Sequence, residues 1–299
     1  MINRLKTLLK GENVLTDEPL CKHTTFKTGG PCKALLMVQS ADELAGVLKL
    51  LKDEGENFFI LGNGSNLLVS DKGYDGYVIK LAGEFLELRL EGDVIVAGAG
   101  VLLSKVCTFA RDNSLAGLEF AYGIPGTVGG AMVMNAGAYG GEMKDVTESV
   151  KLLHGDDTVT LSCDEMHFGY RDSVIKHDDY IALETRFKLQ KGNPEDIAAA
   201  MADFMDRRRT KQPLEFPSAG STFKRPEGAF AGKLIEDAGL KGLRVGGASV
   251  SVKHAGFVVN DQGGTAADVD ELMKLIVKKV KESSGYELKP EVIRIGEFN

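Results

Sequence analysis

Cysteine is scarce in this chain of 299 residues, and its four cysteines stand far apart, at Cys21, Cys32, Cys107 and Cys163. No two of them are spaced as C-x-x-C. The first fifteen residues are too polar for an export signal and fit a small amphipathic helix. These absences exclude an exported protein held together by disulfides. They predict reduced thiols, buried or idle, in a cytoplasmic protein.

A surplus of positive charge is also absent. The chain has 43 acidic against 36 basic side chains, which gives a formal net charge of −7. Nucleic acids and anionic membrane surfaces are bound by proteins with the opposite balance. The sequence therefore predicts no nucleic-acid and no membrane partner, although a local basic site for a small anionic ligand is compatible with this charge.

Several well-defined nucleotide and metal motifs are missing. No G-x-x-x-x-G-K-[ST] occurs, which excludes a P-loop. Gly62 and Gly98 each begin a G-x-G, but Leu67 and Leu103 stand where a Rossmann fingerprint needs its third glycine. There is no H-E-x-x-H or G-x-S-x-G, and the five histidines lack metal-ligand spacing, so we expect no metal site.

Glycine, in contrast, is in excess. Its 36 residues are about 12% of the chain, against a usual ~7%. Residues 120–141 contain seven of them and no charged residue, and hydropathy alone would suggest a membrane span there. Pro125, Asn135 and the glycines give that stretch poor helical propensity, so it predicts a buried, glycine-rich loop system instead.

Apolar periodicity predicts a mixture of strands and helices. Strands at residues 33–38 and 57–61 flank a helix that begins with a capping box at Ser40 and Glu43, and such a unit builds parallel pairing. Further strands are expected at residues 67–70, 77–81, 85–90, 93–97, 146–153, 158–161, 180–189, 221–224, 248–252, 256–260 and 287–295. Further helices are expected at residues 102–113, 194–209, 232–238 and 266–283, the last with Thr265 as N-cap. The class is α+β or α/β, and two prolines within residues 211–218 indicate a domain boundary.

Runs of Gly, Ser, Thr and Asn follow several of these strands. They occupy residues 24–30, 62–66 and 123–140. Successive backbone N–H groups in such runs can bind phosphate oxygens without lysine, although each run alone could be a plain turn. Two such loops in one domain would suit a ligand with two phosphates and a long flat body.

A last group of motifs carries a family resemblance. These motifs are, in chain order, T-F-K-T-G-G, G-N-G-S-N-L-L, I-P-G-T-V-G-G-A, N-A-G-A-Y-G, Y-R-D-S, A-G-S-T-F-K-R-P and K-P-E-V, over about residues 20 to 295. In this order the sequence resembles the UDP-N-acetylenolpyruvoylglucosamine reductases of bacterial cell-wall synthesis. The resemblance implies an α+β protein with the FAD-binding fold of the vanillyl-alcohol-oxidase (PCMH) type. It implies an N-terminal helix (residues 1–20), an FAD-binding domain of two α/β lobes (21–206) and a smaller α/β substrate domain (207–299), whose last strand returns towards the FAD site.

The resemblance also implies a reaction. NADPH would give a hydride to non-covalent FAD, and the reduced flavin would pass it to the enolpyruvyl group of the UDP-sugar. By motif position Ser221 would be the proton donor, and Arg171 and Glu291 would stabilise the enolate. A serine hydroxyl is a weak acid and needs that help. We expect a monomer.

The remaining binding residues come from the same motifs. The expected cofactor-binding residues are Gly62, Asn63, Gly64, Ser65, Asn66, Gly126, Thr127, Gly129, Gly130 and Ala131. The expected substrate-binding residues are Tyr170, Lys211, Lys224 and Arg225. Arg225 stands where the family often has Asn, and the short stretch after Arg171 lacks the tyrosine-bearing insertion of one branch of the family. The basic run at residues 207–211 could contact the diphosphate or simply favour a helix C-terminus.

Two other functions fit the sequence less well. A flavin oxidase of the same fold would lack the Arg171, Ser221 and Glu291 set. A non-catalytic nucleotide-sugar binding protein would not need all three catalytic positions filled. Yellow colour on purification would exclude the binding protein, and oxygen consumption would distinguish an oxidase from a reductase.

Overall fold

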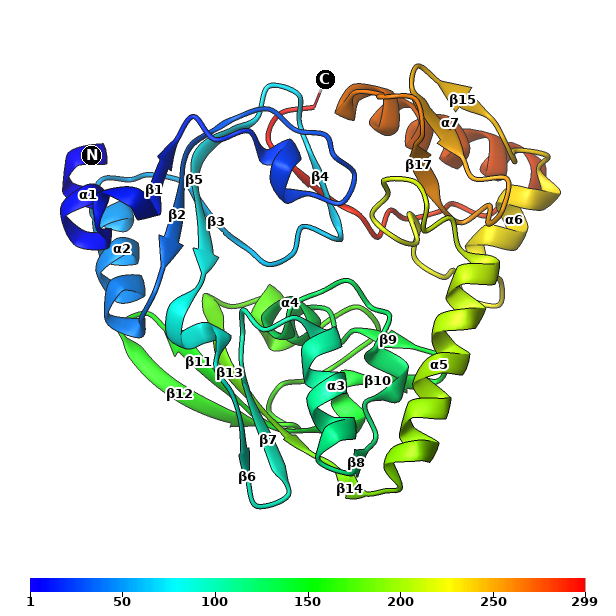
Figure 1. Cartoon of the computed structure of the whole chain (residues 1–299). Coiled ribbons are helices and arrows are strands. Elements are labelled where there is room, and N and C mark those ends of the chain that lie inside the picture. The colour runs from blue at the N-terminus through cyan, green and yellow to red at the C-terminus, as the bar shows by residue number, and fades with distance from the viewer. Residues whose placement is uncertain (299) are drawn as a thin grey trace. The chain divides into compact units, whose positions relative to one another are not determined.

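The computed structural model describes residues 1–298 (Figure 1). The chain divides into two compact units. The first unit comprises Met1–Leu15, Leu35–Asn63 and Val78–Arg207. The second comprises Thr16–Ala34, Gly64–Tyr77 and the chain from Arg208 onward. The last crossing between the two units lies between Arg207 and Arg208.

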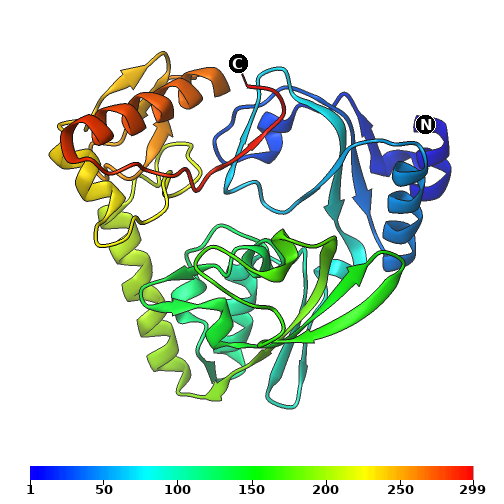
Figure 2. The ribbon, with the colours of Figure 1, turned by 180° about the vertical axis from the view of Figure 1, so that it is seen from behind.

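A five-stranded antiparallel sheet forms the centre of the first unit, in the order β12-β11-β13-β7-β6 (Figure 2). In β11, Val150 and Leu152 are buried on either side of the exposed Lys151, whereas in β7 the successive residues Ile95–Ala97 are all buried, so both faces of that strand are covered. The strands are β6 (Leu88–Glu91), β7 (Val94–Gly98), β11 (Thr147–His154), β12 (Asp157–Ser162) and β13 (Tyr180–Lys188).

A second sheet has the order β1-β2-β5-β3. Its strands are β1 (Val14–Thr16), β2 (Cys32–Val38), β5 (Tyr74–Leu81) and β3 (Phe58–Leu61). The parallel pairing predicted for the strands on either side of the first long helix is wrong, because β5 lies between β2 and β3. The connection through a helix leaves room for a strand that arrives later in the sequence.

The helices begin close to where the sequence predicts them. They are α1 (Ile2–Leu9), α2 (Ala41–Asp53), α3 (Leu103–Asp112) and α5 (Pro194–Lys211). A fifth helix, α4 (Val128–Val133), is not among the predicted ones and packs on β7 and β13. Ser40 caps α2 by accepting a bond from the Glu43 N–H (3.2 Å). The predicted capping box forms only by half, because the Glu43 carboxylate accepts from Gln39 instead of Ser40.

The uncharged stretch at residues 120–141 is partly ordered into regular structure. It contains α4 and the short hairpin β9 (Gly137–Ala138) and β10 (Gly141–Glu142), where we expected only loops. Two further short strands of this unit, β8 (Leu115–Ala116) and β14 (Gln190–Lys191), pair with each other antiparallel. In residues 1–298, no helix is both long enough and apolar enough to cross a bilayer.

The second unit is built on a small antiparallel sheet, β15-β16-β17, and two helices. Its elements are β15 (Arg244–Val245), β16 (Ala248–Val250), β17 (Val258–Asn260), α6 (Ala231–Asp237) and α7 (Ala266–Ser284). A parallel pair joins β4 (Leu67–Val69) to β18 (Ile293–Ile295). The strand expected at residues 221–224 is reduced to a single bridge between Phe223 and Pro290.

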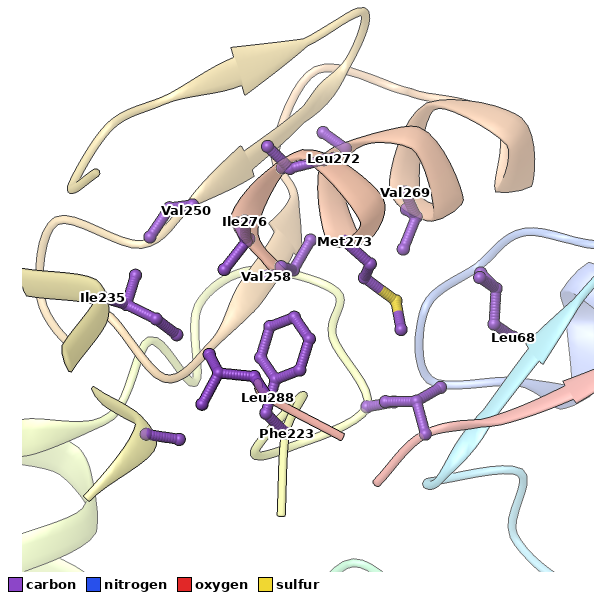
Figure 3. Packing of buried hydrophobic residues seen from close by; sticks show 14 of the residues in the cluster. Leu68, Phe223, Ile235, Val250, Val258, Val269, Leu272, Met273, Ile276 and Leu288 are labelled. Carbon is purple, nitrogen blue, oxygen red and sulfur yellow. The ribbon is translucent and has the colours of Figure 1, made fainter. Parts of the chain in front are cut away.

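Helix α7 supplies much of the core of this unit. Leu272, Met273 and Ile276 are fully buried and lie against Phe223 and Leu68 in one cluster (Figure 3). The predicted N-cap is confirmed: the Thr265 hydroxyl accepts from the Asp268 N–H (3.1 Å), and the Asp268 carboxylate accepts from the Thr265 N–H (2.9 Å).

Candidate active site

The loop between β3 and β4 presents an unusual run of backbone donors. The N–H groups of Gly62, Asn63, Gly64, Ser65 and Asn66 donate no hydrogen bond to any residue that the structure describes. The carbonyls of the loop face the protein, since Gly64 O accepts from Thr25 N–H (3.2 Å) and Asn66 O from Ile293 N–H (2.9 Å). A run of N–H groups oriented away from its own protein is the arrangement that binds phosphate oxygens.

Glycine is required at position 64 of this loop. Its φ is +62°, and a Cβ there would lie 2.1 Å from the carbonyl oxygen of His23. Any larger residue would combine left-handed strain with a clash against backbone. The loop conformation therefore depends on this glycine.

Two of the sequence-predicted glycine loops come together in the first unit. The Asn63 side-chain amide donates to the carbonyl of Pro125 (2.8 Å). A Cβ on Gly62 would lie 2.7 Å from the Thr127 hydroxyl oxygen. The side chain of Asn63 thus fixes the start of one loop on the other.

The second loop, residues 126–131, offers fewer free donors than the sequence suggested. The N–H groups of Gly126 and Thr127 donate no bond within residues 1–298. Those of Gly129 and Gly130 are already used, on Ala99 O (2.8 Å) and the Thr127 hydroxyl (3.4 Å). The N–H of Ala131 is used as well, on Thr127 O (2.9 Å). Gly129 serves close packing, because a Cβ there would lie 3.0 Å from the Cβ of Ala99.

The Y-R-D-S motif forms a tight turn in the same unit. Gly169 and Asp172 pair across it, and Arg171 has a φ of +56°. The Arg171 guanidinium lies 5.3 Å from the centre of the Tyr170 ring and donates to Gly137 O (3.5 Å). The ring of Tyr170 is 54% exposed. Both sequence-predicted residues therefore lie at one surface turn.

Asn135 connects this turn to the N-A-G-A-Y-G segment. Its buried side-chain amide donates to Gly169 O (3.0 Å) and to the Glu142 carboxylate (2.6 Å). Sequence reasoning placed Asn135 in a glycine-rich run without giving it a role. The signal was a lone amide side chain in an apolar stretch, since a buried Asn must find hydrogen-bond partners.

The basic residues at the end of α5 lie in different environments. Arg207 pairs with Asp203 one turn earlier (2.7 Å) and lies over the ring of Phe204, which stacks on Tyr139 at 4.7 Å. Arg208 is buried, while Lys211 is exposed. These contacts indicate that Arg207 stabilises the end of the helix. The exposed Lys211 is accessible to a ligand.

In the second unit, residues that are seventy positions apart become neighbours. Glu291 N–H donates to Thr222 O (2.9 Å), and Lys224 N–H donates to Lys289 O (2.8 Å). Asn66 adds a side-chain bond to Glu291 O (3.1 Å). Ser221 is exposed and Glu291 half-buried. Ser221, Lys224 and Glu291 are thus placed on two adjoining extended segments, with the start of β4 beside them.

Arg225 directly follows Lys224, the last residue of the short backbone ladder formed by the Glu291–Thr222 and Lys224–Lys289 bonds. Its guanidinium carbon lies 4.0 Å from the centre of the Phe230 ring, a close cation–π contact, and Phe230 is 60% exposed. Phe230 was not singled out from the sequence, where nothing distinguishes it from a solvent-exposed residue before α6. This contact fixes the orientation of the Arg225 guanidinium, at the position where the motif often has Asn.

The four cysteines form no disulfide within the residues that the structure describes. All four are free thiols, as the sequence predicts. Burial raises the pKa of the Cys107 thiol to about 12, so it stays protonated and unreactive.

Comparison with known proteins decides the family. Residues 32–162 match the FAD binding domain, and residues 212–295 match the UDP-N-acetylenolpyruvoylglucosamine reductase C-terminal domain. The UDP-N-acetylenolpyruvoylglucosamine reductase of Caldanaerobacter subterraneus is 49% identical over 298 residues, which is 99% of this chain and 98% of that protein. That of Clostridioides difficile is 48% identical over 297 residues, 99% of this chain and 97% of that protein.

The chain belongs to the UDP-N-acetylenolpyruvoylglucosamine reductase family.

A solved structure agrees with this assignment. The crystal structure of the Thermus caldophilus UDP-N-acetylenolpyruvylglucosamine reductase superposes with a TM-score of 0.82 at 38% identity, covering 93% of this chain and 98% of that one. The predicted α+β class with an FAD-binding domain is therefore confirmed. Both glycine loops of this reductase lie in the FAD-binding match, and Ser221, Arg225 and Glu291 lie in the C-terminal match.

Proposed function

We propose that this oxidoreductase uses NADPH to reduce the enolpyruvyl ether of UDP-N-acetylglucosamine enolpyruvate to UDP-N-acetylmuramate, for peptidoglycan precursor synthesis. The observation that carries the proposal is the ladder in the second unit. Its backbone bonds join the segment that carries Ser221 to the segment that carries Glu291, seventy residues later in the sequence, and both segments lie within the match to the reductase C-terminal domain. The proposed enzyme works as a monomer.

The cofactor of this proposal is non-covalent FAD. The residues fit it, because a diphosphate needs several N–H donors without a protein partner, and Gly62–Asn66 with Gly126 and Thr127 supply such donors. Gly129, Gly130 and Ala131 belong to the same site by holding the second loop against Ala99 and Thr127. When bound, FAD would accept the hydride from NADPH and donate it to the substrate.

The protein residues would manage the charge and the proton. Reduction of the enolpyruvyl group puts negative charge on the carbon beside the carboxylate and on that carboxylate. The Arg171 guanidinium and the Glu291 carboxyl group, in its protonated form, would stabilise this charge by hydrogen bonds. The Ser221 hydroxyl would then deliver its proton to the carbon.

The substrate would be held by polar residues around this chemistry. Lys211 and Lys224 would contact the diphosphate, and Tyr170 would contact the sugar end beside Arg171. Arg225, fixed over Phe230, would add a second planar donor group, since a guanidinium binds phosphate oxygens bidentately.

A single assay tests this function against its competitors. The purified yellow protein is mixed with NADPH under air, with and without the enolpyruvyl UDP-sugar, while NADPH absorbance and dissolved oxygen are recorded. We expect NADPH oxidation that depends on the UDP-sugar and consumes no oxygen. Oxygen consumption in step with NADPH would instead identify an oxidase, and a colourless protein that binds the UDP-sugar would identify a binding protein.

A further inference from the structure

The turn that carries Arg171 is held in a strained conformation. A φ of +56° is uncommon for a residue other than glycine, and arginine gains nothing from it locally. Such a conformation persists only where surrounding contacts enforce it, and it marks positions where orientation matters. The contacts that enforce it come from two residues that follow the Y-R-D-S motif.

Lys176 makes the first of these contacts. Its ammonium group donates to the backbone carbonyl of Arg171 (2.9 Å) and lies 3.6 Å from the Asp172 carboxylate. Because the bond is made to the carbonyl of the strained residue itself, it fixes the peptide plane that follows Arg171. The direction of the Arg171 side chain is set by that plane and by the bond to Gly137 O.

His177 makes the second contact. Its Nε2 lies 2.9 Å from both carboxylate oxygens of Asp172. The hydrogen bond from His177 is the main reason that the pKa of Asp172 lies below its usual value. Asp172 therefore stays charged at neutral pH and keeps the Lys176 ammonium beside the turn.

The backbone around these residues is also fixed. Val174 N–H donates to Met166 O (2.9 Å), and the Ser173 hydroxyl donates to Val133 O (3.0 Å). The short helical turn Val174–Lys176 then brings Lys176 back over the carbonyl of Arg171. Lys176 thus acts from a rigid base.

We propose that Lys176 is a positioning residue: with the Asp172–His177 pair, its ammonium holds the strained turn that orients the Arg171 guanidinium for reaction. The inference rests on the proposed role of Arg171 as the group that stabilises the enolate. Lys176 itself acts through the backbone of Arg171 and needs no contact with substrate.

Lys176→Met tests this, because it removes the ammonium and keeps the length of the side chain. The two half-reactions of the FAD-loaded enzyme are measured separately by anaerobic stopped-flow absorbance. We expect reoxidation of the flavin by the UDP-sugar to slow by about 10- to 100-fold, since small misplacement of a catalytic group costs this much. Flavin reduction by NADPH should change less than about 2-fold, and Lys176→Arg should recover part of the lost rate. Lys151→Met, at an exposed position on β11, is the matched control and should leave both rates unchanged.

Combination with Arg171→Ala separates positioning from a general structural role. In the Arg171→Ala background, Lys176→Met should have almost no further effect on reoxidation, because the group that it orients is gone. An equal slowing in both backgrounds would overturn the proposal, and so would full activity of Lys176→Met. If Lys176→Met folds poorly, Asp172→Asn replaces it, since loss of the charge on Asp172 should slow the same half-reaction. Absence of reoxidation in the unmodified enzyme would instead overturn the proposed function, and with it this role.

Discussion

Ser221 is exposed and follows a glycine with a φ of +74°, so its hydroxyl sits at the end of a sharp turn where a substrate can reach it. The neighbouring Thr222 is buried, and its hydroxyl is used structurally, accepting from Val258 N–H (2.9 Å). Of the two adjacent hydroxyl residues, Thr222 is buried with a backbone partner and Ser221 is exposed to solvent.

Ser221→Ala should separate the two half-reactions. Hydride transfer from NADPH requires no proton at the substrate carbon, so flavin reduction should keep its rate. Reoxidation by the UDP-sugar should slow by about 10²- to 10⁴-fold, because a positioned general acid is lost. Anaerobic stopped-flow measurement of each half checks this, with Thr222→Ser, which keeps the hydroxyl of the buried neighbour, as the control. Equal slowing of both halves would mean that Ser221 is a structural turn residue.

The glycines of the two loops differ in what they tolerate. Gly64→Ala should lower both flavin content and the free energy of unfolding, by about 1–2 kcal/mol from left-handed strain alone and more from the clash with His23. Gly126 has no positive φ, and a Cβ there would find its nearest atoms at 3.9 Å. Position 126 therefore has room for a methyl group without backbone strain, and Gly126→Ala is the control. Flavin absorbance per chain and urea denaturation measure both effects. Full flavin content in Gly64→Ala would contradict the role of the loop.

At the scale of elements, α7 illustrates how local signals and burial cooperate. Its first turn is closed by the reciprocal Thr265–Asp268 box, and Asp71 accepts from the N–H groups of Ala266 and Ala267 (2.8 and 2.9 Å). Its last turn ends at Gly285, whose φ of +77° suits glycine. Local signals therefore set where the helix begins and ends, and burial of its apolar face builds the core.

Thr265→Ala should lower the free energy of unfolding by about 1 kcal/mol at pH 7. Thr265→Ser keeps the accepting oxygen and should cost little. The pKa of Asp268 lies below its usual value, mainly because it accepts from the Thr265 backbone N–H. Its contribution is therefore complete above the unfolded-state pKa of about 4 and is lost as the pH falls through the lower folded-state pKa. Urea denaturation between pH 7 and pH 3 should show a smaller loss of stability for Asp268→Asn than for the unmodified chain. An identical loss would exclude this contribution.

For the whole molecule, the division into units depends on contacts between distant segments. β4 pairs with β18, Asp71 caps α7, and the Asn260 side chain donates to Phe26 O (3.1 Å). These bonds bind Thr16–Ala34 and Gly64–Tyr77 to the C-terminal residues. Within the loop at Gly62–Asn66 the chain passes from the first unit, which includes Asn63, to the second, which begins again at Gly64.

The proposed cofactor should leave the protein without breaking a covalent bond. Backbone amides bind a diphosphate only while the chain is folded. Precipitation with acid should therefore release about one FAD per chain into the supernatant, measured by its absorbance and fluorescence. Yellow colour that stays on the precipitated protein would show a covalent link and contradict the non-covalent proposal.

Local sequence signals determined the elements of this protein, and its motifs determined its family. The caps at Ser40 and Thr265, the apolar periods and the proline at the start of α5 gave helices close to their observed bounds, because these signals act within one or two turns. The motifs around Gly62, Gly126 and Ser221 carried the family resemblance because they retain residue types that the chemistry needs.

Tertiary structure alone decided which strands pair, which segments share a unit and which amides remain available. β5 lies between β2 and β3 in the sheet. The N–H groups of Gly129 and Gly130 donate to Ala99 O and to the Thr127 hydroxyl, and the Lys176 ammonium donates to Arg171 O. Each depends on hydrogen bonds between groups whose separation in space is not encoded by any local pattern. Such pairings form only when the burial of the whole core brings the segments together.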